Sequence, residues 1–543
     1  MRDSLFAIPF LAALVVALAH CGSSDDSAGA SSGTGGFSGG GGNGGVATGG
    51  NGGAPTLDAG VDAKPPPEKE LESSFRAPVA TGRYVWSANP TSGRVALIDA
   101  FTLDLSIVEA GFGPTYLAAI ADPANAEANV AIVLNVLSHD ATLFRVGNDA
   151  TISQKTLATH QGANAWAVSP KGHWAIAWTD ASQVKNPDPT DGFQDVTVVR
   201  VDPGQESSTI LSVGYRPTKI TFDANETRAF AVTEPGISVV ALPSSGEPSV
   251  DSLIEVTDDP LENPASRDVT ITPDGSYALV RRDGSADVSF VDLGTGTRTP
   301  ITLSGEVTDL DLSEDGTRAV AVVRESSEVF VLPVPGVLAA PADMDQVQVD
   351  GELFGSVALS ADTSVALLYT NAVPNDHMTI LSLAAGAGYL GHRTVALKAP
   401  VQAVFPAPDA QHAIALGSTT AGSSKAGAFS VVPTAALLSP KIVGTDAPPT
   451  AVALRPAPNS DRALITIRDD GKKVYGVYVV RLPNLQVDLL PLASPPLATG
   501  IVPLAGKGYV AQQHPEGRIT FVDLEDGSAK TLTGFELGAK VVD

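Results

Sequence analysis

The chain has 543 residues and a formal net charge of −26, from 34 Lys and Arg against 60 Asp and Glu. An acidic surface of this kind repels phosphate backbones, so we expect no nucleic acid among the partners. One cysteine in the whole chain excludes an internal disulfide framework, a multi-cysteine zinc site and a C-x-x-C-H haem attachment. Hydrophobic residues make up 43% but aromatic residues only 6%, with 53 Gly and 40 Pro, which is typical of many short strands and turns.

The N-terminus has the pattern of an export signal. Arg2 precedes an apolar run of 15 residues, Leu5 to Ala19, which only Pro9 interrupts. A transmembrane helix needs about 20 apolar residues, so this run is too short to span comfortably and matches the central region of a signal peptide. The sequence predicts a signal peptide over residues 1–20.

The segment Leu18-Ala19-His20-Cys21 resembles the bacterial lipobox, in which a hydrophobic and two small residues precede a cysteine that becomes lipidated. His20 departs from this pattern, because the family has Gly, Ala or Ser there. The resemblance implies that Cys21 is acylated and anchors the protein to the outer membrane or in the periplasm. The alternative is an ordinary secretory signal with an incidental cysteine. Export of the protein is expected in both cases.

A flexible tether follows over residues 21–74. Residues Gly22 to Gly53 are almost entirely Gly, Ser, Ala, Asn and Asp, and Pro65 to Pro67 form a stiffer spacer. No Lys-Ser or Lys-Thr pair follows the glycines, so a phosphate-binding loop is not indicated.

Residues 75–543 are predicted to form one folded unit, and from Arg83 onward the chain repeats itself. The unit contains an apolar segment, a turn of the Pro-Asp-Gly kind, an Ala- and Val-rich strand, a polar turn and an alternating strand. It is clearest in Asp268 to Leu293 and in Asp309 to Val334. One position of the second strand recurs at Val85, Ala131, Ala175, Ala229, Ala278, Ala319, Val365, Ala413, Ala463 and Val510.

The spacing of this position ranges from 41 residues (Ala278 to Ala319) to 54 residues (Ala175 to Ala229). A period in the forties with several strands per unit is typical of propeller blades. The sequence therefore predicts an all-β fold, a β-propeller of four-stranded antiparallel blades with ten blade-like repeats. We favour one continuous ring over two propellers or a ring with incomplete units, and we interpret the long spacing as an inserted loop at Asn186 to Asp195.

These repeats resemble the YVTN-type propellers and, more widely, the WD40 class. The matching elements are the turn Thr272 to Gly275 and the Val-Asp-Leu endings at Val291 to Leu293 and Val522 to Leu524. Propellers of this kind host binding, lactone hydrolysis and redox chemistry, so the resemblance implies a fold and not one activity.

Acidic residues in one repeat are weak candidates for a calcium site. Asp309, Asp311, Glu314 and Asp315 give the pattern D-x-D-x-x-E-D-G. The EF-hand spacing is missing, however, and the alternation with Leu310 is that of a strand ending in a turn. The sequence predicts no metal and no cofactor, although a site assembled from several blades at the ring centre stays an alternative.

Tryptophans and histidines give further weak candidates. Trp174 and Trp178 fall on one face of a strand close to Trp166, where they form either an aromatic cage for a ligand or part of the packing between blades. Eight histidines are scattered without H-x-H or H-x-x-x-H pairs, and His173 and His412 occupy equivalent positions that suggest turns. No G-x-S-x-G motif occurs.

Together these features predict a lipid-anchored, cell-envelope propeller that binds an unknown protein or glycan through loops on one face. The alternative is a propeller enzyme, either a lactonase-like hydrolase or a quinone- or metal-dependent oxidoreductase. We also expect the C-terminal strand Ala539 to Val542 to close the ring by supplying the inner strand of the blade that begins at Tyr84, because only FRAPVATG precedes Tyr84.

Overall fold

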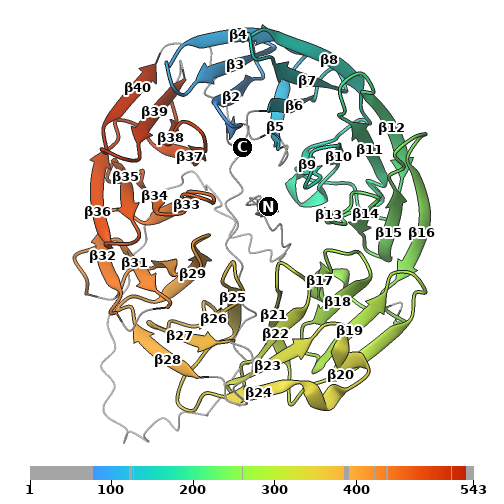
Figure 1. The fold of residues 1–543 in the computed structure, drawn as a ribbon, viewed down its shortest axis with the longest axis vertical. Helices are drawn as coiled ribbons and strands as arrows, with labels where there is room; N and C mark the ends of the chain where they lie inside the picture. The colour runs from blue at the N-terminus through green and yellow to red at the C-terminus, as the bar shows by residue number, and fades with distance from the viewer. Residues whose placement is uncertain are drawn as a thin grey trace, which may run out of the picture.

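The computed structural model describes residues 78–121, 125, 128–259, 261–383, 391–420, 422–435, 438–514 and 517–533. Within these ranges, forty strands form ten four-stranded antiparallel sheets, each built from consecutive strands. The sheets stand as blades around a common axis in one ring (Figure 1). The predicted all-β propeller and its ten repeats are therefore confirmed, and each repeat is a complete blade. The predicted signal peptide, Cys21 and the tether lie outside the described residues.

Blade 1 comprises β1 to β4, blade 2 comprises β5 to β8, and the numbering continues to blade 10 with β37 to β40. The inner strands are β1 (Val79–Ala80), β5 (Pro114–Ile120), β9 (Ala165–Val168), β13 (Lys219–Phe222), β17 (Arg267–Ile271), β21 (Val307–Leu312), β25 (Ser356–Leu359), β29 (Val401–Pro406), β33 (Pro449–Leu454) and β37 (Pro496–Val502). The second strands are β2 (Tyr84–Asn89), β6 (Asn129–Asn135), β10 (Trp174–Trp178), β14 (Arg228–Val232), β18 (Tyr277–Arg282), β22 (Arg318–Val323), β26 (Val365–Tyr369), β30 (His412–Gly417), β34 (Arg462–Asp469) and β38 (Lys507–Gln512).

The third strands are β3 (Arg94–Asp99), β7 (Asp140–Val146), β11 (Asp195–Arg200), β15 (Gly236–Ala241), β19 (Asp287–Asp292), β23 (Glu328–Pro333), β27 (His377–Ser382), β31 (Gly427–Pro433), β35 (Val474–Arg481) and β39 (Arg518–Asp523). The outer strands are β4 (Leu105–Glu109), β8 (Ile152–Ala158), β12 (Ser207–Ser212), β16 (Ser249–Glu255), β20 (Arg298–Thr302), β24 (Asp345–Gln348), β28 (His392–Ala396), β32 (Lys441–Thr445), β36 (Gln486–Pro491) and β40 (Ala529–Thr533). In the described part of the chain, four short 3-10 helices lie in connections: η1 (Ala181–Gln183), η2 (Pro264–Ser266), η3 (Gly336–Leu338) and η4 (Pro341–Asp343). No helix among the described residues is long and apolar enough to cross a membrane.

The recurring Ala or Val of the repeat lies on the second strand of every blade. Nine of these ten side chains are fully buried, and Val365 is 9% exposed. The adjacent positions of the same strands carry large buried side chains such as Trp86 and Phe230. The repeat therefore marks one buried position on the second strand of each blade, occupied by a small side chain.

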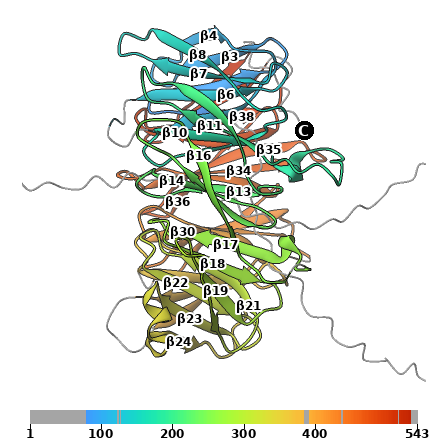
Figure 2. The ribbon, with the colours of Figure 1, turned by 90° about the vertical axis from the view of Figure 1, so that its right-hand side faces the viewer.

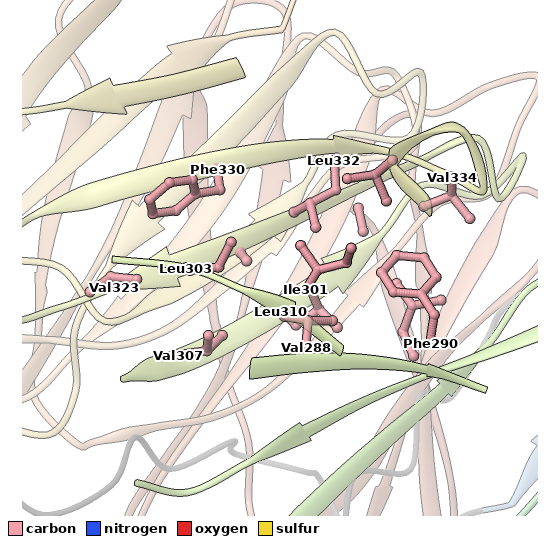
Figure 3. Packing of buried hydrophobic residues seen from close by; sticks show 14 residues of the cluster. Val288, Phe290, Ile301, Leu303, Val307, Leu310, Val323, Phe330, Leu332 and Val334 are labelled. Carbon is pink, nitrogen blue, oxygen red and sulfur yellow. The ribbon is translucent and has the colours of Figure 1, made fainter. Parts of the chain in front are cut away.

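Apolar layers between neighbouring blades form the core. Between blades 5 and 6, Leu279 and Phe290 pack against Leu310, Phe330 and their neighbours (Figure 3). Period-2 alternation on each strand sends one set of side chains toward each neighbouring blade, so every sheet is buried on both faces. The core is a series of such layers around the ring and has no single centre.

The ring closes between blades 10 and 1. Lys507, the first residue of β38, donates a hydrogen bond through Nζ to the carbonyl of Ala100 (2.8 Å), directly after β3. Two junctions inside the chain repeat this contact: Arg318 donates to the carbonyl of Leu383 (2.8 Å) and Arg462 to that of Leu524 (2.9 Å). The closing junction thus uses the same contact as junctions between blades that are consecutive in sequence.

The structure corrects the reasoning behind the closure prediction. A strand does precede Tyr84 in blade 1, because β1 pairs with β2 through Val79 opposite Trp86 and Ala80 opposite Val85. Pro78 is compatible with this, since a proline just before a strand removes no ladder hydrogen bond. Residues 534–543, which include the predicted closing strand, lie outside the described residues.

Candidate functional site

The ring has two faces with different connections. On one, which we call the loop face, outer strands lead to the next inner strand and second strands turn into third strands. On the other, the turn face, first strands turn into second strands and third strands into outer strands. The assignment follows from the antiparallel order of every blade.

Two large apolar side chains project from the loop face between blades 1 and 2. Phe112, in the connection from β4 to β5, is 75% exposed, and Leu137, in the turn from β6 to β7, is 72% exposed. They are neighbours, because the backbone N–H of Leu137 donates to the carbonyl of Phe112 (3.1 Å) and that of Phe112 to Ser138 Oγ (3.0 Å). We call these two side chains the apolar pair.

The apolar pair stands on a tightly packed support. A Cβ on Gly111 would lie 2.6 Å from side-chain atoms of Asn135 and Asp140, and Gly113 has a φ of +68° with Leu137 Cγ 2.8 Å from its ideal Cβ position. Only glycine fits both places. The backbone on either side of Phe112 is therefore closely packed against the turn that carries Leu137.

An inserted loop of blade 3 forms the second feature of this face. Residues 179–194 connect β10 to β11 and project beyond the blades in Figure 2. The prediction of an insertion near Asn186 to Asp195 is confirmed, and we call residues 179–194 the blade 3 loop. Tyr215 Oη donates to the carbonyl of Pro189 (2.9 Å), and the Arg216 guanidinium donates to the carbonyls of Pro189 (3.0 Å) and Asp191 (3.1 Å), so blade 4 holds the far part of this loop.

The four acidic candidates for calcium do not form one cluster. Asp309 and Asp311 lie on β21, where their carboxylates accept the backbone N–H groups of Val357 (2.7 Å) and Leu359 (2.9 Å) on β25 of the next blade. These two residues therefore tie two inner strands together.

The other two candidates lie in the turn after β21. Glu314 is exposed, and Asp315 accepts hydrogen bonds from Ser313 Oγ (2.6 Å) and the N–H of Thr317 (3.0 Å). These bonds lower the pKa of Asp315. Among the described residues, no three His, Cys, Asp or Glu side chains are grouped closely enough to hold a metal ion.

The tryptophan candidates lie in the packing between blades. Trp174 is 4% and Trp178 is 7% exposed, and both belong to the apolar layer that joins blades 3 and 4. Trp166 packs in the layer between blades 2 and 3 and donates through Nε1 to the carbonyl of Tyr116 (3.1 Å). The structure thus divides the three rings between two layers.

The described histidines lie in turns or connections or at the first residue of a strand, and one of them, which the sequence did not single out, is buried. His173 and His412 precede or begin second strands and contact Asp202 and Asp409 through Nδ1 (2.5 and 2.6 Å). His160, by contrast, is buried at the root of the blade 3 loop, and burial lowers its pKa to about 4. Phe112 was also missed, although an aromatic residue between two glycines in a connection is a readable signal.

Comparison with known proteins gives no family. No family model matches the sequence, and no curated protein matches it. Among solved structures, the chain is similar to a eukaryotic initiation factor (12% identity, TM-score 0.46, 76% of this chain and 96% of that chain). It is also similar to the β-propeller domain of Cps50 (Swd1) from Myceliophteria thermophila (13%, 0.32, 62% and 95%). A third similar structure is the dihydro-heme d1 dehydrogenase NirN in complex with DHE (13%, 0.39, 67% and 80%).

These similarities concern the fold alone. The protein is a ten-bladed β-propeller of four-stranded antiparallel blades.

Proposed function

We propose that this propeller is a binding module that contacts a protein or glycan through its loop face. The observation that supports this proposal is the distribution of exposed apolar side chains. Among the described residues, the three large hydrophobic side chains that are more than 60% exposed, Phe112, Leu137 and Leu261, all lie on the loop face. Apolar side chains on a rigid support are typical anchors of interfaces, because binding them costs little conformational entropy.

The test compares matched variants on the two faces. Phe112→Ser with Leu137→Ser removes the apolar pair, and Phe101→Ser removes an aromatic side chain that is 51% exposed on the turn face. We expect the double variant to lose capture of a partner from an envelope extract or a glycan array, while Phe101→Ser and the unmodified protein capture the same partner. Equal capture by all three proteins, with equal melting temperatures, contradicts a binding role for the loop face.

We further propose that the module is exported and anchored through a lipid on Cys21, which rests on the lipobox resemblance. Incorporation of a fatty-acid analogue tests this directly: the native protein takes up the label and partitions with membranes, and Cys21→Ser does neither. Equal partitioning of both forms without label incorporation removes the anchor from the proposal.

The alternative function as a propeller enzyme stays open, because the fold hosts both kinds of activity. It is tested with the same purified protein by measuring turnover of lactones and of redox dyes. For a binding module we expect no turnover above the buffer rate.

A further inference from the structure

His160 is buried under one end of the blade 3 loop. It lies in the connection from β8 to β9 and is 6% exposed. Its backbone N–H donates to Thr197 Oγ1 (2.9 Å), its Nδ1 lies 2.8 Å from the same oxygen, and its Nε2 lies 3.3 Å from Thr179 Oγ1. Thr179 is the first residue of the blade 3 loop, so the imidazole connects the loop to the blade beneath it.

The first attachment of the loop is completed by the next residue. The backbone N–H of Asp180 donates to Asn164 Oδ1 (2.7 Å), and Asn164 Nδ2 donates to the carbonyl of Asp180 (3.0 Å). Asn164 belongs to the same connection as His160. The root of the loop at Thr179 and Asp180 is therefore held by the segment from His160 to Asn164.

The second attachment is made to blade 4 and is independent of His160. The backbone N–H of Arg216 donates to the carbonyl of Gly192 (2.7 Å), and the Tyr215 and Arg216 side chains bind carbonyls of the loop. The loop is thus held at two places, by the connection from β8 to β9 and by the connection from β12 to β13.

The hydrogen bonds at the first attachment fit a neutral imidazole. Thr197 Oγ1 accepts the backbone N–H of His160, and a neutral ring with its hydrogen on Nε2 can accept the Thr197 hydroxyl hydrogen at Nδ1 and donate to Thr179. In the imidazolium both ring nitrogens are donors, so the Thr197 hydroxyl must turn its hydrogen away and accept from Nδ1–H as well. Burial also disfavours the charged ring, and it is the main reason that the pKa of His160 falls to about 4.

Few charged groups face His160. Asp195 at the start of β11 attracts the charged ring and opposes the effect of burial. Asp180 engages Ser182 and Gln183 with its carboxylate, and the turn from β6 to β7 contributes the His139 carbonyl, which accepts from the N–H of Thr159. One carboxylate, that of Asp195, therefore modulates the titration.

We propose that the blade 3 loop is an acid-released arm of the binding face: protonation of His160 frees the attachment at Thr179 and Asp180, while the attachment to Tyr215 and Arg216 holds. The regulatory meaning of this arm rests on the proposed function of the loop face. The release itself is a property of the free protein.

The pH window follows from linkage. In the released loop His160 is solvated and titrates near its ordinary value of 6.5, whereas in the closed loop its pKa is about 4. The released state binds the proton more tightly than the closed state. The equilibrium constant between the closed and the released loop is therefore constant above pH 6.5, increases as the pH falls, and becomes constant again below about pH 4. Between pH 7 and pH 5 the expected increase is roughly 20-fold.

Hydrogen exchange followed by mass spectrometry tests the release in the absence of any partner. After correction for the intrinsic exchange rate, amides in a peptide spanning residues 179–186 should exchange roughly 20-fold faster at pH 5 than at pH 7. A peptide spanning residues 213–217 reports on the second attachment and should show no such change. Because no partner is present, failure of the binding proposal leaves this measurement unaffected.

Two variants identify the titrating group. His160→Gln should abolish the pH dependence of exchange in the loop, and His412→Gln, at the start of β30 in blade 8, is the matched control that should retain it. Asp195→Asn, at an exposed position, removes the attraction that stabilises the charged ring in the closed loop, so the pKa of His160 in the closed loop falls further. The opening of the loop should then continue to increase below pH 4, where that of the native protein levels off, and this test remains even if His160→Gln fails to fold. Unchanged exchange in the native loop down to pH 4.5, the same pH dependence in His160→Gln, an Asp195→Asn loop whose opening levels off at the same pH as the native one, or simultaneous exchange throughout the ring overturns the proposal.

Discussion

At the scale of single residues, two side chains that the sequence offered as metal-ligand candidates form hydrogen bonds between neighbouring blades. Asp309 and Asp311 alternate with leucines on β21 and accept two N–H groups that β25 leaves unpaired by its own blade. The D-x-D pattern is the same whether the two carboxylates bind a metal ion or accept hydrogen bonds from the next blade. What distinguishes them is the neighbouring strand, which a single repeat does not contain.

The first prediction concerns these two carboxylates. Asp309→Ala leaves the buried N–H of Val357 without its acceptor, and we expect a loss of about 1–3 kcal/mol in stability. Glu314→Gln, at the exposed neighbouring position, should change stability by less than about 0.5 kcal/mol. Thermal denaturation of both variants gives the comparison, and equal melting temperatures would mean that the tie between β21 and β25 contributes nothing.

The second prediction uses the same residues to test for calcium. If Asp309 and Asp311 are structural ties, a chelator should leave the melting temperature of the native protein unchanged, because no bound ion stabilises the fold. A fall of several degrees on adding chelator, reversed by calcium, would restore the metal interpretation.

At the scale of elements, turns as well as strands contact the neighbouring blade. Gly172, in the turn between β9 and β10, has a φ of +79°, and a Cβ there would lie 2.1 Å from the carbonyl oxygen of Ala121 in blade 2. Gly204, in the turn between β11 and β12, has a φ of +77° and nothing within 4 Å. These two glycines have the same backbone conformation and differ only in the neighbouring blade.

The third prediction exploits this pair. Gly204→Ala should cost about 1 kcal/mol, which is the strain of a left-handed alanine. Gly172→Ala carries the same strain and in addition forces two blades apart, so we expect a cost of about 3 kcal/mol or more. Differential scanning calorimetry measures both, and a Gly172→Ala protein as stable as Gly204→Ala would show that the turns do not transmit contact between blades.

At the scale of the whole molecule, stability depends on one junction that joins the two ends of the described ring. Tyr509 is 4% exposed in the layer shared by blades 10 and 1, and its hydroxyl donates to the carbonyl of Pro78 (2.6 Å). Burial raises the pKa of Tyr509, so the hydroxyl stays protonated and available as a donor.

The fourth prediction is that Tyr509→Phe weakens this junction. The substitution keeps the aromatic side chain but leaves the Pro78 carbonyl without its hydrogen-bond donor. We expect the free energy of unfolding to fall by about 1–3 kcal/mol. Tyr475→Phe, at a tyrosine of blade 9 away from the junction, is the control and should be close to neutral. Urea denaturation followed by tryptophan fluorescence reports the difference, and equal denaturation curves would show that the hydroxyl contributes nothing to closure.

The fifth prediction tests the proposed C-terminal strand. Deleting residues 537–543 should cost several kcal/mol if Ala539 to Val542 add to the inner edge of blade 1. If β1 and the contacts of Lys507 and Tyr509 are enough to close the ring, the truncated protein has the same melting temperature as the full chain. The experiment decides between closure by packing alone and closure that also uses the C-terminus.

The sequence by itself determined the architecture of this protein. The period in the forties, the recurring Ala or Val and the Asp- and Gly-containing turns are local features, and each blade is one continuous segment, so ten repeats became ten blades without information from distant residues. Strand order and the position of the inserted loop could be predicted for the same reason.

The tertiary structure alone decided what lies between and on top of the blades. The role of Asp309 and the burial of Trp178 depend on the next blade, where Val357 lies 48 residues beyond Asp309. The burial of His160 and the exposure of Phe112 depend on how the connections and turns of the ring pack against one another. Two residues pressed together across a junction share no local pattern that a single chain segment reveals. For that reason the fold was readable from the repeats, whereas the candidate binding face and its acid-sensitive loop required the assembled ring.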